Sequence, residues 1–250
     1  MLNTLLVAAM MTVGAPTPTE TNLTLPAATP ASAWTRVSLT DEPARWRTQV
    51  CAGVTGISGA NAQYVVDRVS SRAEELGLRV GAPGCRANLL VVFSSDPKAQ
   101  AQAIARERTD PASLTGLSGA SDGRAAYNDF LNGDQPVRWW RVVRPVTDTG
   151  LAVDRNVRAG DAPRINVPER GRLGSTTFDA FSHVIVIIDL EQVNGRRLDA
   201  LADYIAMVSL SPLNERADVG GSSILGLFAE SAAPQAITEA DRAYLARVYR

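Results

Sequence analysis

The single histidine of the chain, His183, limits the chemistry that its side chains can perform. A zinc site with two or more histidines and the H-E-x-x-H motif are excluded, because each needs several imidazole ligands. His183 could act as a general base for a distant serine, although the sequence lacks the G-x-S-x-G pattern of serine hydrolases. The simpler interpretation is a histidine that begins a strand and bonds to the backbone.

Three carboxylates, Asp189, Glu191 and Asp203, follow His183 along the chain. Carboxylates in one place can act as a general acid and base or bind a hard cation. One hypothesis is therefore a hydrolase that uses these carboxylates or His183, with His183, Asp189 and Asp203 in a cleft beneath two irregular loops. These loops cover residues 109–136 and 147–175. The alternative is that Asp189 or Glu191 caps the next helix or solvates the turn before it, while Asp203 lies at the rim of that helix's buried face. Neither a metal nor a cofactor is predicted.

Arginines and tryptophans are interleaved in a predicted strand. Arg138 and Arg141 flank Trp139 and Trp140, and Arg144 follows just after the strand. Such a pattern can bind a phosphate, a glycan or a carboxylate through cation–π and bidentate contacts. The candidate anion-binding residues are Arg138, Trp139, Arg141 and Arg144. The whole chain is biased toward arginine, however, since its 25 basic residues include one lysine. That bias favours a solvated strand face with core tryptophans.

Cys51 and Cys85 are the two cysteines, and their even number suits a disulfide in an exported protein. Neither has a histidine nearby in the sequence, and no C-x-x-C motif is present, which disfavours a redox or nucleophilic role. A bridge would tie the two ends of the helix predicted between them and stabilise the fold by about 3–4 kcal/mol. Two buried thiols, or one reactive thiol, are the alternatives.

The first residues suggest export. The apolar run at residues 5–15 is too short to span a bilayer but suits the core of a signal peptide. The next stretch is rich in proline, threonine and alanine, a composition typical of a tether. We expect a signal peptide and tether over residues 1–33, one domain over residues 34–250, and a periplasmic or secreted location. A buried N-terminal strand or helix is the alternative. No transmembrane segment is predicted in the mature chain.

Hydrophobic periodicity and capping residues predict the elements that must position these side chains. Helices are expected at residues 58–76, 96–108, 125–131, 196–210, 222–228 and 238–249, and strands at residues 88–93, 137–143 and 183–189. Ser58 and Gly77 should cap the first helix, Thr238 and Asp241 should form a capping box in the last one, and Pro145 should end the second strand. The continuous apolar run at residues 88–93 is typical of an interior strand. The helix at residues 196–210 is apolar nearly all round toward its end, so we expect it to be central. The pattern predicts a single α+β domain, with helices packed on a small mixed sheet.

The composition excludes some classes of partner. Apolar residues make up 45% of the chain, enough for a full core, and the net charge is −1 at neutral pH. A near-neutral chain lacks the broad positive field that attracts nucleic acid or an anionic membrane. We therefore expect no nucleic-acid partner, and an envelope component or another protein remains open.

Several motifs together resemble an uncharacterised family of exported alphaproteobacterial proteins, over about residues 46–250. They are Val50-Cys51-x-x-Val54-x-Gly56, Gly84-Cys85-x-x-Asn88-Leu89, the stretch from Leu201 to Met207, the stretch from Ser223 to Phe228, and the tail from Ile237 to Tyr249. In that family both cysteines occupy these positions, which supports the disulfide. The tail also resembles domains related to zinc metallopeptidases, whose preceding helix carries a metal-binding His-Glu pair. Ala202-Asp203 stands there in this chain, so the resemblance implies a zincin-like scaffold without the zinc site.

These observations favour a non-catalytic, exported binding or envelope-associated module, in effect a pseudoenzyme on a metallopeptidase-like scaffold. The hydrolase described above is the rival hypothesis. Fold alone does not decide between them, because one scaffold can host unrelated activities.

Overall fold

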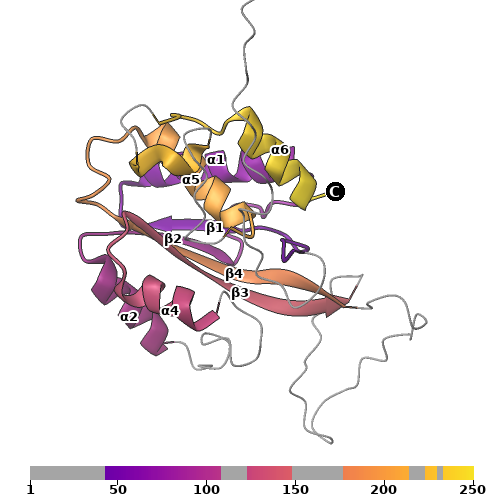
Figure 1. The fold of residues 1–250 in the computed structure, drawn as a ribbon, viewed down its shortest axis with the longest axis horizontal. Coiled ribbons are helices and arrows are strands. Elements are labelled where there is room, and N and C mark those ends of the chain that lie inside the picture. Colours follow the sequence, from indigo (N-terminus) through magenta and orange to yellow (C-terminus); the bar gives the residue numbers. More distant parts are fainter. Residues whose placement is uncertain (1–42, 108–122, 148–176, 214–222, 230–232) are drawn as a thin grey trace, which may run out of the picture.

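The computed structural model describes residues 43–107, 123–147, 177–213, 223–229 and 233–250. The predicted signal peptide and tether at residues 1–33 lie outside these ranges, as do most of the two loops predicted to cover the cleft. The described residues form a single-domain α+β fold in which helices pack on both faces of a small mixed sheet (Figure 1).

The sheet has four strands in the order β1-β2-β4-β3. Strands β1 (Ala52–Thr55), β2 (Leu89–Ser94) and β4 (Thr177–Asp189) run parallel, and β3 (Val137–Thr147) pairs antiparallel with β4 at one edge. The short strand β1 was not predicted, because four residues, three half-buried and one exposed, carry too little pattern to detect. Strand β2 lies in the interior of the sheet, as its continuous apolar run predicted.

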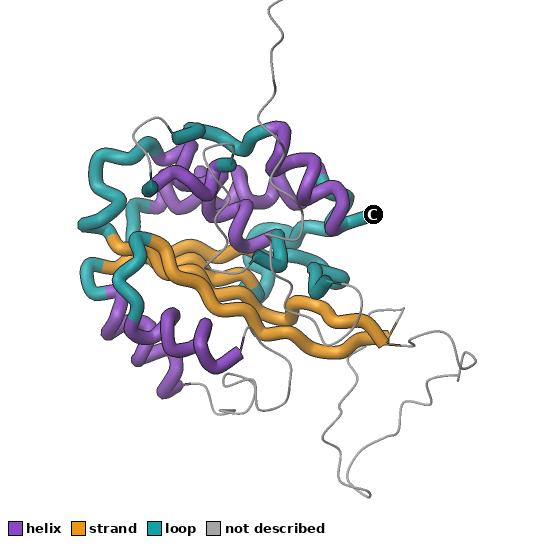
Figure 2. Tube along the Cα trace, in the orientation of Figure 1, coloured by secondary structure: helices purple, strands orange, loops and turns teal. Residues whose placement is uncertain are grey.

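Helices cover the two faces of the sheet unequally (Figures 1 and 2). Helices α1 (Gly59–Glu75), α5 (Leu198–Leu210) and α6 (Glu239–Val248) lie on one face, together with the short 3₁₀ helix η3 (Ile224–Phe228). Helices α2 (Pro97–Glu107) and α4 (Gly123–Asn132) lie on the other. The first face therefore carries the larger core.

Alternation along β4 assigns its side chains to these two cores. Val184, Val186 and Ile188 belong to the core beneath α1, α5 and α6. Ile185 and Ile187 belong to the smaller core beneath α2 and α4. All residues from Ala200 to Leu210 in α5 are buried, which confirms the prediction that this helix is central.

Most predicted elements are confirmed within a few residues, with three local corrections. Strand β3 continues through Pro145 to Thr147, because an edge strand tolerates a proline whose nitrogen needs no hydrogen. Ser58 occupies the cap position of α1, but its side chain makes no capping hydrogen bond. The segment predicted as a short helix at residues 222–228 is a 3₁₀ turn. The capping box of Thr238 and Asp241 is present as predicted.

The disulfide between Cys51 and Cys85 is confirmed. It joins the segments that enter β1 and β2, so it closes the first strand–helix–strand unit at the amino ends of two neighbouring strands. Asn88 reinforces the same corner, because its side chain accepts from the Cys51 amide at 2.8 Å and donates to the Gln49 carbonyl at 2.8 Å. Gly81 leaves room for the bridge, since a Cβ there would lie 2.3 Å from the Cys85 sulfur.

Within the described ranges, none of the helices is long and apolar enough to cross a membrane.

Removing the bridge should destabilise the fold without changing it. We expect the Cys51→Ser/Cys85→Ser variant to lose about 3–4 kcal/mol of unfolding free energy, because its unfolded chain is no longer closed into a loop. Urea unfolding followed by circular dichroism measures the difference, and reduced wild-type protein should match the variant. Equal midpoints for oxidised wild type and the variant would show that the bridge constrains nothing.

Candidate functional site

The structure separates the residues of the predicted cleft. His183 lies in β4, where Ile185 and Ile187 follow it on the face covered by α2 and α4. Asp203 lies in α5, on the opposite face of the sheet. Asp189 ends β4, six residues beyond His183, which corresponds to about 20 Å along an extended strand. These three side chains do not share one cleft.

Asp189 organises the turn that follows β4. Its carboxylate accepts hydrogen bonds from the Glu191 and Gln192 amides at 2.9 and 3.2 Å, and from the Gln192 side chain at 2.8 Å. Burial acts to raise the pKa of Asp189, but these bonds and the charge of Arg138 outweigh it and lower the pKa. Glu191 is exposed. Asp189 therefore holds the turn after β4 and does not cap α5, which begins at Leu198.

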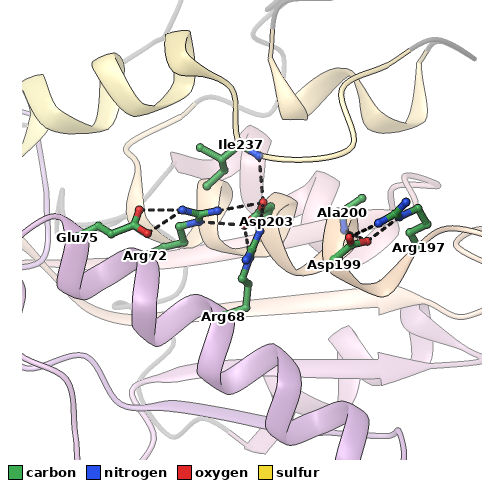
Figure 3. A network of polar contacts seen from close by, with 8 residues as sticks. All are labelled: Arg68, Arg72, Glu75, Arg197, Asp199, Ala200, Asp203 and Ile237. Carbon is green, nitrogen blue, oxygen red and sulfur yellow. Dashed lines mark hydrogen bonds and ion pairs between the residues drawn. The ribbon is translucent and has the colours of Figure 1, made fainter.

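Asp203 is fully buried and is the centre of an ionic network between helices (Figure 3). Arg68 of α1 donates to its two oxygens at 2.8 and 2.8 Å. Arg72, one turn later, donates to them at 3.0 and 3.3 Å, and also forms an ion pair with Glu75. The Ile237 amide, just before α6, donates at 3.1 Å. One carboxylate therefore joins α1, α5 and the segment leading into α6.

The electrostatics of Asp203 follow from these partners. Burial alone acts to raise the pKa of this carboxyl, since it disfavours the charged form. Hydrogen bonds from Arg68, Arg72 and the Ile237 amide outweigh burial, and the pKa of Asp203 is lowered. The pKa of Arg68 is raised, chiefly by its hydrogen bond to Asp203. Asp203 is thus held ionised as a structural anion, with both of its oxygens occupied.

The arginines predicted to bind an anion point to different parts of the molecule. Arg138 is buried, and its guanidinium donates to the Phe130 carbonyl at 3.3 Å and to the Gly133 carbonyl, at the end of α4. Arg141 is also buried and donates to the Ser211 and Leu213 carbonyls, beyond the end of α5.

The two guanidiniums therefore satisfy backbone carbonyl groups in the last turn of α4 and just beyond the ends of α4 and α5. Arg144 is exposed, and Trp139 is buried in the larger core. The structure does not gather Arg138, Arg141 and Arg144 into one site.

A pocket that the sequence did not reveal lies beside Trp139, with a cavity volume of about 260 Å³. Its lining residues come from three segments that are distant in the sequence, namely the start of β3, helix α5 and the turn η3. They are Gln135, Pro136, Val137, Arg138, Trp139, Tyr204, Leu225, Phe228 and Ala229.

The pocket lies at the carboxyl edge of the parallel strands, since Val137 pairs with Ile188, the penultimate residue of β4. Ligands of open sheets commonly bind at this edge.

Aromatic rings dominate the walls of this pocket. Tyr204 and Phe228 pack edge to face, with ring centroids 5.1 Å apart. The exposed guanidinium of Arg196 lies 5.7 Å from the Phe228 ring centroid. Trp139 is 6% exposed, and its indole nitrogen has no hydrogen-bond partner. Of these residues, sequence reasoning singled out only Trp139, and a lone tyrosine within the aliphatic run of α5 was the available signal for Tyr204.

Among the residues that the structure describes, no group of three or more His, Cys, Asp or Glu side chains lies together as a metal site would require.

Comparison of the chain with protein-family models, with curated proteins and with solved structures found no match. The structure itself defines the class, a disulfide-bonded single-domain α+β protein with an aromatic pocket.

Breaking the buried network around Asp203 should lower the stability of the fold. We expect Asp203→Asn to lower the free energy of unfolding by about 3–5 kcal/mol, because Arg72 would stay buried without its anion. Because the folded-state pKa of Asp203 lies below the unfolded value of about 3.9, its stabilisation is present above that pH and is lost as the pH falls through the folded value.

Urea unfolding at pH 7 and pH 3 tests both statements. The wild type should lose more stability over this interval than Asp203→Asn. The control is Asp199→Asn. Asp199 pairs with the exposed Arg197, so this replacement should change the free energy of unfolding far less. A variant as stable as wild type at pH 7 would contradict the structural role of Asp203.

Arg141, which is buried in β3, gives a second test. Arg141→Met should destabilise the protein by about 1–3 kcal/mol, because the buried carbonyls of Ser211 and Leu213 lose a charged donor. The matched replacement of exposed Arg144 by Met should be nearly neutral. Thermal and urea unfolding measure both. A larger loss of stability in Arg144→Met than in Arg141→Met would mean that Arg141 does not support the fold.

Proposed function

We propose that the protein is an exported binding module that works in the periplasm or outside the cell, without catalysing a reaction. The Cys51–Cys85 disulfide carries the export part of this proposal. Structural disulfides persist in oxidising compartments and are rare where thiols are kept reduced. Cys85 is exposed, so a reducing cytoplasm would have direct access to the bridge.

The pocket beside Trp139 supports the binding part. A concave, largely apolar site with a few polar groups is the usual form of a small-ligand site. Two of the carboxylates that the sequence offered for catalysis have structural roles, since Asp203 joins α1, α5 and the segment leading into α6, and Asp189 holds a turn. The proposed ligand is a small molecule or part of an envelope component or protein.

The resemblance to domains related to zinc metallopeptidases supports the same proposal. By this resemblance, α5 is the helix that would carry the metal-binding His-Glu pair, and Ala202-Asp203 stands in its place. Asp203 here binds Arg68 and Arg72. The proposed protein is then a pseudoenzyme, in which a former catalytic helix has become the centre of a structural network.

The export proposal is tested by fractionating bacteria that express the full chain. Thiols are trapped with acid and labelled with a maleimide reagent after denaturation. We expect a periplasmic product that is shortened at its N-terminus and carries no label on either cysteine. A variant lacking residues 1–33 is the control, and it should stay in the cytoplasm with both thiols labelled. A full chain found in the cytoplasm with two labelled thiols would overturn the export part.

The non-catalytic part is tested with the purified, disulfide-bonded protein on peptide and ester substrates. We expect no hydrolysis above the buffer rate. Hydrolysis that a folded Asp203→Asn or His183→Gln variant loses would favour the rival hydrolase.

A further inference from the structure

We propose that the pocket formed by β3, α5 and η3 binds an aromatic ring that carries a carboxylate. The inference rests on the proposed binding function and names the chemical class of the ligand. Two sources offer this chemistry: a free arylalkanoic acid, and the C-terminal residue of a peptide that ends in an aromatic side chain.

The size of the pocket suits one ring with a short substituent. Its volume is about 260 Å³. An apolar protein cavity of about 150 Å³ is large enough to hold benzene. Sites for larger, drug-sized ligands run from about 300 to 1,000 Å³. The pocket lies between these limits, so a single ring and the first two or three atoms of its substituent would fill it, and the carboxylate would extend out of it toward the exposed Arg196.

The walls favour an aromatic ring over an aliphatic chain. Trp139, Tyr204 and Phe228 all line the pocket, and Val137 and Leu225 complete the apolar lining. Aromatic side chains attract another ring in offset or edge-to-face contact, beyond the area that they bury. Tyr204 and Phe228 already adopt an edge-to-face arrangement with each other, which a third ring can extend.

The polar groups favour a ligand with an anionic acceptor. No aspartate or glutamate is among the lining residues, which include Arg138. Arg138 already donates to backbone carbonyls and lies close enough to Asp189 for their charges to interact.

Arg196 is not a lining residue, but it packs against one of them, Phe228. Its exposed guanidinium lies over the Phe228 ring, and no described residue forms an ion pair with it. A carboxylate bound beside Phe228 would meet this guanidinium and gain a charge-assisted hydrogen bond.

Trp139 offers a second polar contact. Its indole N–H is buried in the wall of the pocket and has no hydrogen-bond partner among the described residues. A buried donor without a partner is costly. Because the indole nitrogen itself has almost no exposed surface, an acceptor on the ligand would relieve that cost only after a small rotation of the ring. Trp46 shows the usual arrangement in this protein, since its indole nitrogen donates to the Ser209 carbonyl at 2.9 Å.

The experiment measures binding of small probes to the purified, disulfide-bonded protein by calorimetry and by NMR of the indole N–H groups. The probes are N-acetylphenylalanine, its uncharged amide and N-acetylalanine. We expect the acid to bind about tenfold more tightly than the amide, because its carboxylate gains one charge-assisted hydrogen bond. N-acetylalanine should not bind. The Trp139 indole signal, assigned with Trp139→Phe, should shift, and the Trp140 signal from the opposite face should not.

Arg196→Gln and its neighbour Arg197→Gln form a matched pair of variants. Arg197 is exposed and paired with Asp199, so its loss should leave binding unchanged. Arg196→Gln should weaken the acid about tenfold and remove the difference between acid and amide. Phe228→Ala should weaken both probes alike. Equal affinity of acid and amide for wild-type protein, or an unchanged Trp139 signal, would overturn the proposal.

Two further probes separate the sources. 3-Phenylpropionate stands for the free acid, and a tripeptide ending in phenylalanine stands for the peptide, compared with one that has phenylalanine in the middle. Tighter binding of the C-terminal phenylalanine peptide assigns the peptide source, and tighter binding of 3-phenylpropionate assigns the free acid. An exported, oxidised protein that binds none of the probes would overturn this inference alone. A reduced cytoplasmic protein that binds them would overturn only the proposed export.

Discussion

The buried carboxylate of Asp203 is the contact on which the packing of the larger face depends. It draws Arg68 and Arg72 of α1 onto α5 and fixes the segment that enters α6 through the Ile237 amide. A charge so deeply buried persists only when its partners replace the lost water. The network therefore orients α5, and α5 in turn supplies Tyr204 to the wall of the pocket.

Several buried or partly buried charged residues in the described part of the chain bind the backbone or one another. Arg138 and Arg141, on opposite faces of the sheet, bind carbonyls at the ends of α4 and α5. Asp189 binds the amides of a turn. In each case a helix or strand end leaves polar groups without partners, and a nearby charge satisfies them. The pocket's own walls are mostly apolar, which suits recognition of a ligand by shape and by a few polar contacts.

Fold class and element order were predictable because they depend on local pattern. The periodicity of α1, the apolar run of β2 and the capping box of Thr238 each act within a few residues. The candidate site was not predictable in the same way. His183, Asp189 and Asp203 looked alike as titratable groups near one strand, but which face of the sheet each side chain meets depends on how the helices pack on it.

The sequence by itself determined the α+β class and the central position of α5, and it favoured a bridge between the two cysteines over free thiols, since composition, periodicity and an even cysteine count are local or additive properties. Only the tertiary structure decided that Asp203 is a structural anion, that neighbouring arginines serve opposite faces, and that Trp139, Tyr204 and Phe228 share one pocket. The physical reason is that burial and partnership arise from contacts between segments far apart in the chain, and no local pattern records which segments will meet.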